Sequence, residues 1–523
     1  MAVPAPVTPR RGQLSLALAV LCLLLFLTFL DNTIVSVTLG SIQEDLHAGV
    51  SSLQWVVNAY ALPFASVMLA CGMIGDELGR KKVMLGGAGV FCAGSVLCAT
   101  APSVGVLIAG RVVMGLGAAA SEPGTLSLLR HLYTDEPDRN RAIGVWAAVS
   151  GLALALGPVI GGTLVGAWDW RAIFWFNLAF GLVALTAAAT VLPESADPGA
   201  GRVDTAGSLI GAAALAALVF AVITGESAGY GSAQVVVLFA VAAAGAVAFV
   251  ERERRARHPL LDLRYLRVPR FSVAALAAFC TYFGTLAIFF FVALYLDEVV
   301  GDSGFRIALV FLPMTALMIG ASLAAGPLTT RLGPRWLVLA GCAVFAAGLV
   351  LTDVVLRPDP DQAALGATLA LAGLGIGTTV VPITSSALSA VPPERSGMAS
   401  SATNTSREMG AVIGVAVLGA LVNATLRHDL LGRLRQLGVP PTFQEIVIRG
   451  VETGAVPSSG RSPGGAAAAA GAGHGGEVQQ VIDAAYTAFH SGLRDALLLS
   501  AVLVAIAGVL CAALLEGRHR SVP

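Results

Sequence analysis

The chain has 523 residues, of which 56% are hydrophobic and only 12% are charged, and its formal net charge at pH 7 is +0. A soluble protein carries about 25% charged residues, so this chain has too few water-facing side chains to cover a soluble globule. The composition therefore excludes a soluble protein and predicts an integral membrane protein with many spans.

Fourteen apolar runs follow one another along the chain, and each is long enough to cross a bilayer as a helix of about 20 residues. The predicted fold class is therefore an all-α integral membrane protein. The first run is too long for a signal peptide and many spans follow it, so we expect it to remain in the protein. The predicted spans begin near Leu14, Trp55, Val83, Val104, Ala142, Ala172, Thr205, Ala233, Phe271, Ile307, Trp336, Ala363, Thr403 and Leu493. Because this number is even, both termini lie on one side of the membrane.

Lysines and arginines are distributed unevenly between the loops. Most of the 32 fall in the terminal tails and in the loops on the same side, among them Arg80–Lys82 and the connector Glu251–Arg270. The short loops on the other side hold few, such as Arg171. Because cytoplasmic loops are the ones enriched in Lys and Arg, we expect a multi-pass protein of the cytoplasmic membrane with both termini in the cytoplasm.

A short charged stretch, Gly72–Lys82, lies between the second and third runs. Its glycines permit a tight reversal of the chain, and its cations favour the cytoplasmic surface. A related stretch, Gly326–Arg335, lies between the tenth and eleventh runs, with Gly333 in the place of Gly79. This repeat predicts two six-helix bundles with an inserted pair of helices between them.

The predicted organisation has three parts. Residues 1–195 form the first six-helix bundle, residues 196–270 form the inserted pair and a basic cytoplasmic connector, and residues 271–523 form the second bundle. A long outer loop is expected at about residues 424–492. Within it, the low-complexity stretch Val456–Gly476 is typical of a flexible linker.

Few ionisable side chains lie well inside the predicted spans. They are Asp31, Arg111, Glu122, Arg407 and Glu408. Charges at membrane depth usually face a polar cavity or a partner, so each is a candidate functional residue. Asp31 and Arg111 lie about 9 and 10 Å from the outer ends of their spans, which places them at similar depth.

Glu122 follows Arg111 by eleven positions in the same predicted helix. It therefore falls within about 20° of the same face, about 16 Å further in. Two other interpretations remain open: a purely structural ion pair, or a Glu122 that reaches the inner membrane surface.

The fifth run contains Gly157, Pro158, Gly161 and Gly162. Pro158 removes a backbone hydrogen bond and bends the helix, while the glycines let a neighbouring helix approach closely. Ordinary packing of small residues is the alternative interpretation.

Several segments of the chain together resemble a known transporter family. They are Leu30–Val35, Gly72–Lys82, Arg111–Gly117, Gly157–Gly162, Trp170–Asn177, His258–Leu263 and Asn404–Arg407. Over nearly its full length the chain resembles a fourteen-helix major facilitator of the drug:proton antiporter-2 family, and the glycines around Pro158 are similar to that family's antiporter motif. The chain departs from the family pattern at Glu77, Met114, Glu122, Ala153, Asp297 and Glu408.

The resemblance implies proton-coupled efflux of drugs or antibiotic-like small molecules by alternating access. The substrate is expected to be cationic or amphipathic, and the energy source is the proton gradient, with no cofactor and no nucleic-acid partner. We expect the protein to be a monomer in the lipid bilayer.

The resemblance also assigns roles to residues. Asp31 and Arg111 are candidates for coupling protons to substrate, since a carboxyl group in a semi-apolar cavity can load and release a proton. Glu122, where the chain departs from the family pattern, is the third candidate because it shares a helix face with Arg111. The expected conformational latch consists of Gly72, Asp76, Gly79, Arg80 and Lys81. The secondary candidates are Asn404, Arg407 and Glu408.

Other functions leave weaker signals in the sequence. A proton-coupled uptake symporter and an exporter of an endogenous metabolite remain open as alternatives. An integral-membrane enzyme or a channel is disfavoured, because the seven histidines are scattered and no repeated pore loop is present. The seven cysteines lie in apolar runs without metal-ligand spacing, so no metal site is expected. No G-x4-G-K-[ST] nucleotide-binding loop is present, so the chain does not hydrolyse ATP directly.

Overall fold

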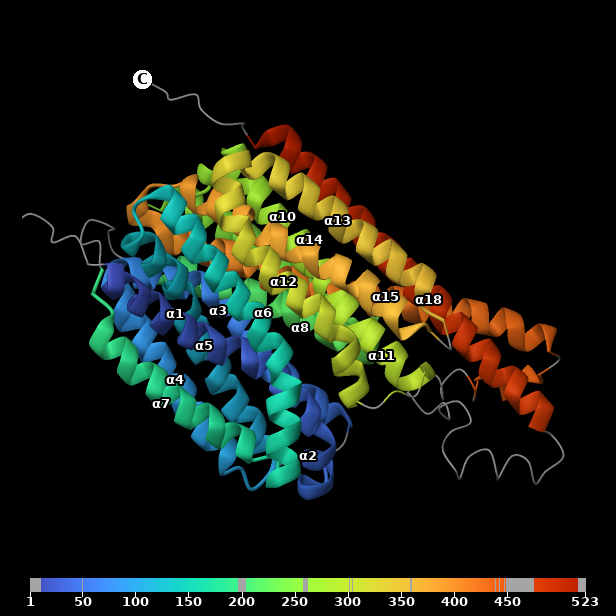
Figure 1. Cartoon of the computed structure of the whole chain (residues 1–523). Helices are drawn as coiled ribbons and strands as arrows, with labels where there is room; N and C mark the ends of the chain where they lie inside the picture. Colours follow the sequence, from blue (N-terminus) through green and yellow to red (C-terminus); the bar gives the residue numbers. More distant parts are fainter. Residues whose placement is uncertain are drawn as a thin grey trace, which may run out of the picture.

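A computed structural model describes residues 11–515 apart from 49, 196–203, 257–261, 301, 303, 358–359, 438, 442, 446 and 448–474. These residues form an all-helical bundle in which fourteen helices are long and apolar enough to cross a membrane, as the sequence predicted (Figure 1). The boundary predicted between residues 195 and 196 borders a stretch outside the described residues, and so does most of the predicted linker.

The first six spans lie side by side in one part of the bundle (Figure 1). Their helices are α1 (Arg11–Ile34), α3 (Val50–Leu78), α4 (Arg80–Ala99), α5 (Val104–Leu132), α6 (Glu136–Ala167) and α7 (Ala172–Val191). The short helices η1 (Ser36–Thr38) and α2 (Leu39–Leu46) continue α1. We call this group the N-half.

The last six spans form the second part, which we call the C-half. Its first span combines α10 (Pro269–Ala287), the π-helix η3 (Ile288–Val292), α11 (Ala293–Tyr295) and the π-helix η4 (Leu296–Val300). The remaining spans are α12 (Gly304–Leu332), α13 (Pro334–Val355), α14 (Gln362–Ser389), α15 (Ser396–Gln436) and α18 (Gly475–Leu514). The 3-10 helices η2 (Tyr265–Arg267) and η5 (Pro393–Arg395) precede α10 and α15.

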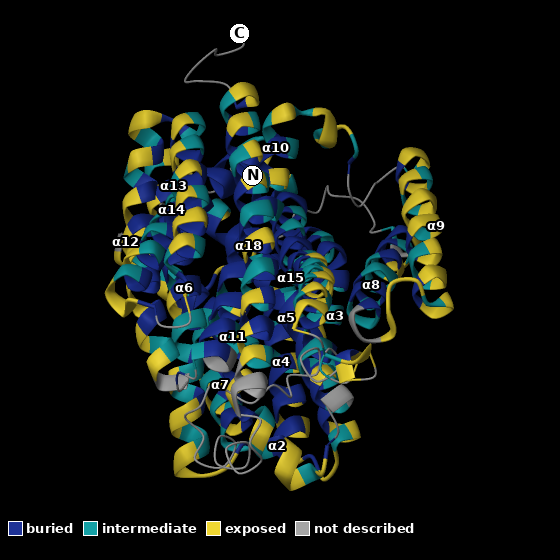
Figure 2. Cartoon of the chain, turned by 90° about the vertical axis from the view of Figure 1, so that its right-hand side faces the viewer, coloured by how far each residue is buried: buried dark blue, intermediate teal, exposed yellow. Residues whose placement is uncertain are grey.

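The inserted pair consists of α8 (Thr205–Ala228) and α9 (Ala233–Arg255). Helix α8 packs against α3 of the N-half and against α15 of the C-half, whereas α9 packs mainly on α8. Figure 2 shows α9 at the edge of the molecule with exposed residues along its length. The pair is thus attached through α8, on the seam between the two halves.

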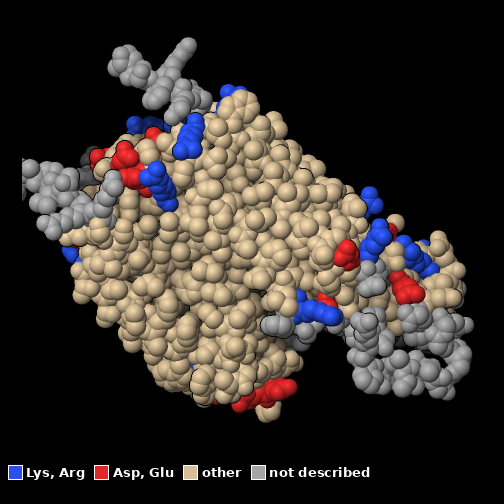
Figure 3. All heavy atoms as spheres, viewed as in Figure 1, with Lys and Arg blue, Asp and Glu red and all other residues tan. Residues whose placement is uncertain are grey.

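On the face shown in Figure 3, charged side chains gather at the two ends of the bundle and leave a wide uncharged belt between them. This belt is what a hydrocarbon layer about 30 Å thick requires. We call the end at which α1 begins and α18 finishes the terminal face, and the opposite end the distal face.

The predicted outer loop at residues 424–492 is helical at both of its ends. Helix α15 continues to Gln436 and α18 begins at Gly475, so the two helices project beyond the others at the distal face (Figure 1). Leu426, Leu430 and Leu434 pack there with three alanines of α18, Ala484, Ala485 and Ala488. At these two ends the expectation of a loop was wrong, because charged residues hide the leucine spacing of a helix that packs outside the membrane.

The predicted turn at Gly72–Lys82 is much shorter than its charge pattern indicated. Helix α3 continues through Leu78 and α4 begins at Arg80, so Gly79 alone reverses the chain, at φ +110°. Gly333 does the same between α12 and α13 at φ +84°. Only glycine adopts such angles readily, and the two equivalent reversals support the repeat that the sequence predicted.

Candidate functional site

Asp31 and Arg111 form a buried ion pair inside the N-half. Arg111 Nη1 donates to Asp31 Oδ2 at 2.5 Å, and both side chains are almost completely enclosed. The second carboxylate oxygen, Oδ1, accepts from Nδ2 of Asn177 at 2.7 Å. Both oxygens of this membrane-embedded carboxyl group therefore have donors, one of them charged.

Arg111 is also held by α3. Its Nε donates to the carbonyl oxygen of Val56 at 3.0 Å, and its guanidinium carbon lies 4.5 Å from the centre of the Tyr60 ring. The Tyr60 hydroxyl in turn donates to the carbonyl of Thr28 on α1. The pair thus connects α1, α3, α5 and α7, and loss of one charge would leave the other buried without its partner, at a cost of about 3–5 kcal/mol.

The glycine–proline motif of α6 packs against α1 just beyond Asp31. A Cβ atom at Gly157 would lie 1.9 Å from Oγ1 of Thr33, and one at Gly161 would lie 2.6 Å from Val37. A Cβ atom at Gly162 would meet nothing within 4 Å. Close approach therefore requires Gly157 and Gly161, whereas the prediction that Gly162 also serves helix packing was wrong.

A second group of charged residues lies deeper in the bundle, between the halves. Glu122 of α5 is 2% exposed, and Arg407 of α15 is 3% exposed. Both Arg407 and the half-buried Glu408 lie close enough to Glu122 for their charges to act on it. We call Glu122, Arg407 and Glu408 the central cluster.

Arg407 is fixed by neutral partners and aromatic rings. Its Nη1 donates to Oδ1 of Asn404 at 2.9 Å, and its Nη2 donates to the hydroxyl of Thr384. The rings of Trp146 and Tyr282 each lie 5.5 Å from the guanidinium carbon.

The two charged groups lie at different depths. Glu122 is about 15 Å from the terminal end of α5, and Glu408 is about 18 Å from the start of α15, whereas Asp31 is about 30 Å from the start of α1. We call these depths the two layers. Arg111 and Glu122 lie on the same helix, but Arg111 pairs with Asp31 in the layer nearer the distal face, whereas Glu122 belongs to the central cluster in the deeper layer. Burial at this depth also shows that Glu122 does not reach the membrane surface.

Asp76 joins the halves at the terminal face. Its Oδ1 accepts from the backbone N–H of Gly397 and its Oδ2 from that of Met398, both at 3.0 Å. These groups belong to the first turn of α15, where backbone donors lack partners inside the helix and a negative charge is favoured. A carboxylate of the N-half thus caps a helix of the C-half.

Arg80 strengthens this contact. Its Nε donates to Asp76 at 2.8 Å, and its Nη2 donates to the carbonyl oxygens of Pro393 and Glu394 at 3.3 and 3.2 Å. Gly72 adds a close approach, since a Cβ atom there would lie 2.4 Å from that of Ser401.

The other two predicted latch residues do not bridge the halves. Lys81 Nζ donates to the carbonyl of Ala189, and its backbone N–H donates to Glu194, so its contacts lie within the N-half. Gly79 also faces Glu194. Of the five predicted residues, Gly72, Asp76 and Arg80 therefore form the contact between halves.

Further contacts close the terminal face. The hydroxyls of Ser127 and Ser396 lie 2.9 Å apart, and Arg130 Nη2 donates to the carbonyl of Val391 at 2.6 Å. Each pair joins the N-half to the C-half, so the halves are tied together at this end.

Asp262 provides an attachment to which sequence reasoning assigned no role. Its Oδ2 accepts from Arg264 at 2.8 Å and from Arg395 at 2.7 Å, and the hydrogen bonds from Arg264 lower the pKa of the Asp262 carboxyl. Asp262 belongs to the connector after α9, while Arg395 directly precedes α15. The connector thus holds the chain next to the Asp76 contact. The motif residues that precede Asp262, 258–261, lie outside the described residues.

A sequence profile of the Major Facilitator Superfamily matches residues 21–415. The chain belongs to this superfamily.

Curated relatives of this facilitator are drug-resistance proteins by name. The chain is 36% identical over 425 residues to the multidrug resistance protein Stp of Mycobacterium tuberculosis, covering 81% of this chain and 78% of that protein. It is 33% identical over 497 residues to the multidrug efflux pump LfrA of Mycolicibacterium smegmatis, covering 95% of each. It is also 36% identical to the methylenomycin A resistance protein of Bacillus subtilis, covering 78% of this chain and 87% of that protein.

A solved structure has the same fold at low sequence identity. The human organic anion transporter MFSD10 superposes with a TM-score of 0.61 and 15% identity, covering 94% of this chain and 99% of that one. This likeness concerns the fold of the facilitator alone.

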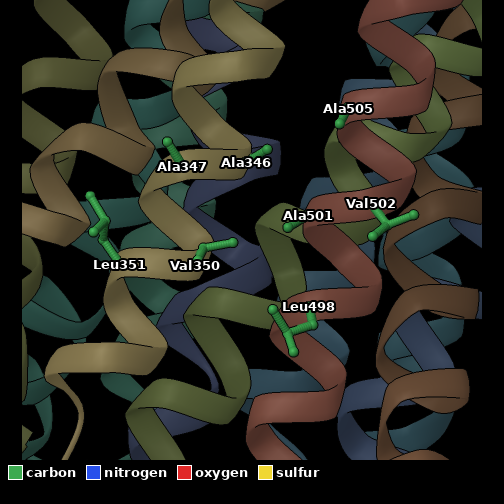
Figure 4. A pocket seen from close by; sticks show the side chains of 8 residues that line it. All are labelled: Ala346, Ala347, Val350, Leu351, Leu498, Ala501, Val502 and Ala505. Carbon is green, nitrogen blue, oxygen red and sulfur yellow. The ribbon is translucent and has the colours of Figure 1, made fainter.

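An apolar groove of about 510 Å³ lies on the surface of this facilitator, between α13 and α18 (Figure 4). It is lined by Ala346, Ala347, Val350, Leu351, Leu498, Ala501, Val502 and Ala505. Its lining offers no side chain that could hold a proton or a charged ligand.

Proposed function

We propose that the protein exports drug-like small molecules across the cytoplasmic membrane in exchange for protons, by alternating access, with one chain as the functional unit and no cofactor. Its relatives Stp and LfrA are named as multidrug resistance and efflux proteins. The observation that carries the proton-coupled part of the proposal is the buried Asp31–Arg111 pair, a titratable group in the membrane with a charged partner on another helix.

Protonation of Asp31 changes the energy of a contact between helices. A neutral carboxyl group loses the attraction to Arg111 and must redistribute its hydrogen bonds with Asn177. Proton binding therefore shifts the balance between arrangements of α1, α5 and α7. Glu122 in the deeper layer is the substrate-binding or second coupling residue in this scheme.

We take the terminal face to be cytoplasmic, because Arg80, Lys81 and Lys82 lie there. The contacts of Asp76, Arg80, Ser127 and Arg130 then close the cytoplasmic side in this structure. Opening to the cytoplasm requires these contacts to break, so Gly72, Asp76 and Arg80 act as the latch between two access states.

Everted membrane vesicles test the direction of coupling. A gradient that is acid inside is imposed and followed with a pH-sensitive dye, and a panel of a cationic dye and an uncharged antibiotic is then added. Exchange predicts that a transported compound collapses the gradient while it accumulates inside. Movement of compound and protons in the same direction would indicate a symporter and contradict the proposal.

A further inference from the structure

Glu122 has a buried oxygen without a hydrogen-bond donor among the described residues. Its Oε2 is enclosed and accepts no hydrogen bond from the described residues. The Nη atoms of the nearby Arg407 donate to Asn404 and Thr384 instead. A buried acceptor without a donor is unfavourable, so the site is suited to a ligand that brings a donor.

The charge of the central cluster defines how many positive charges that ligand should carry. With both carboxylates ionised, Glu122 and Glu408 outweigh Arg407 by one negative charge. Glu408 is half-buried and makes no hydrogen bond to the described part of the chain. One monovalent cation between α5 and α15 balances the cluster.

The aromatic rings at this site already have a cation. Trp146 and Tyr282 each face the guanidinium of Arg407 at 5.5 Å. A quaternary ammonium ion is normally recognised by aromatic faces, because it has no N–H to donate. Here Arg407 already lies over both ring faces, whereas Oε2 of Glu122 accepts no hydrogen bond from the described residues.

We infer that the central cluster binds a monovalent organic amine whose charged nitrogen retains an N–H, and that it discriminates against the corresponding quaternary ammonium ion. The N–H donates to Oε2 of Glu122, and Glu408 contributes charge from the other half. This inference rests on the proposed function, since it specifies the substrate class of an exporter.

Equilibrium binding to the purified full-length chain in lipid nanodiscs tests the inference. The probes are radiolabelled dodecyldimethylamine, which is protonated at pH 7, and dodecyltrimethylammonium, with binding to empty nanodiscs subtracted. The two cations differ only by a methyl group in place of the N–H. The extra methyl adds apolar area and favours the quaternary ion, so a preference for the amine cannot arise from hydrophobicity.

The wild type is expected to bind the amine about tenfold more tightly, as one hydrogen bond to a charged group predicts. Glu122→Gln should weaken both cations, because a negative charge is removed, and should weaken the amine more, because its N–H loses a charged acceptor, so that the ratio falls to about one. Glu408→Gln should weaken both cations alike and keep the ratio, since its contribution is charge alone. Size-exclusion profiles of the variants confirm folding.

Three results would overturn the inference: equal binding of both cations by the wild type, no binding of either, or an unchanged ratio in Glu122→Gln. The proposed function is judged separately, by proton movement with an uncharged substrate in everted vesicles. Proton exchange without a preference for the amine would contradict the inference and leave the proposed function intact. A preference for the amine without proton exchange would support the inference and contradict the proposed function.

Discussion

The Thr33 hydroxyl donates to the carbonyl oxygen of Leu154 at 3.1 Å, four residues before Pro158. That carbonyl has no helical donor, because proline lacks an N–H. A hydroxyl from a neighbouring helix thus satisfies the backbone group that proline frees, as membrane proteins require. Since Thr33 is two residues beyond Asp31, the proline segment of α6 is tied directly to the helix that carries the buried carboxyl group.

Thr33→Val should lower the free energy of unfolding by about 1 kcal/mol, because a partly buried carbonyl loses its donor while the side-chain shape is kept. Thermal unfolding of the purified protein in detergent measures this change. Thr163→Val is the matched control on α6: its hydroxyl bonds only to the carbonyls of its own helix and is exposed. Equal effects of the two substitutions would contradict the interpretation.

Gly157→Ala should be harmful, whereas Gly162→Ala should be tolerated. A methyl group at 157 collides with Thr33, and overpacking costs about 1–3 kcal/mol. A methyl group at 162 enters open space and gains helix propensity of about 0.5–1 kcal/mol. Thermal stability and transport should therefore fall in the first variant and be kept in the second. Loss in both would mean that the whole motif, rather than its packed glycines, is required.

Arg80→Gln should loosen the terminal face, whereas Lys81→Gln should not. Arg80 holds the chain before α15 and orients Asp76, while Lys81 bonds within the N-half. Hydrogen exchange measured by mass spectrometry should show at least about tenfold faster exchange of the peptide containing Gly397 and Met398 in Arg80→Gln. A similar acceleration in Lys81→Gln would argue against the assignment.

Asp262→Asn should detach the connector from Arg395 and lower the free energy of unfolding by up to about 1 kcal/mol, as partly exposed ion pairs do. The hydrogen bonds from Arg264 lower the pKa of Asp262 below its usual value. Its stabilising contribution is therefore present above the usual pKa and is lost only as the pH falls through the lowered value.

Between pH 5 and pH 8 the difference in melting temperature between Asp262→Asn and the wild type should consequently stay constant. A difference that disappears on going from pH 8 to pH 5 would show that Asp262 titrates in that range. The pH dependence of transport would then have a second source besides the membrane-embedded carboxyl groups.

The spans were predictable because a run of apolar residues is a local property of the sequence. The Asp31–Arg111 pair was predictable because the position of a residue along a span gives its depth in the membrane. Apolar runs identified the spans, and the positions of Asp31 and Arg111 along their helices predicted similar depth. The bond from Asn177 to Asp31 could not be predicted in this way. An uncharged amide in an apolar helix does not reveal from the sequence which group it will bond. Which carboxylate it bonds depends on how α7 packs against α1.

Contacts between distant segments could not be read from the sequence. Arg80 and Lys81 are neighbours with similar charge, but they project about 100° apart around α4, and only the packing decides which one faces the C-half. The Asp262–Arg395 pair joins positions 133 residues apart. The extension of α15 past residue 424 was missed because charged residues lie between its leucines, and such a mixed segment is typical of a loop outside the membrane.

Asp31 is the residue that we propose couples protons to substrate, and proteoliposomes that contain the Asp31→Asn variant test this role. Two activities are measured with the same transported compound: exchange of labelled for unlabelled compound without a gradient, and release of protons when the compound is added. Asp31→Asn should keep exchange but lose proton movement, because its amide cannot take up a proton near neutral pH. Undiminished proton movement in Asp31→Asn would contradict this role.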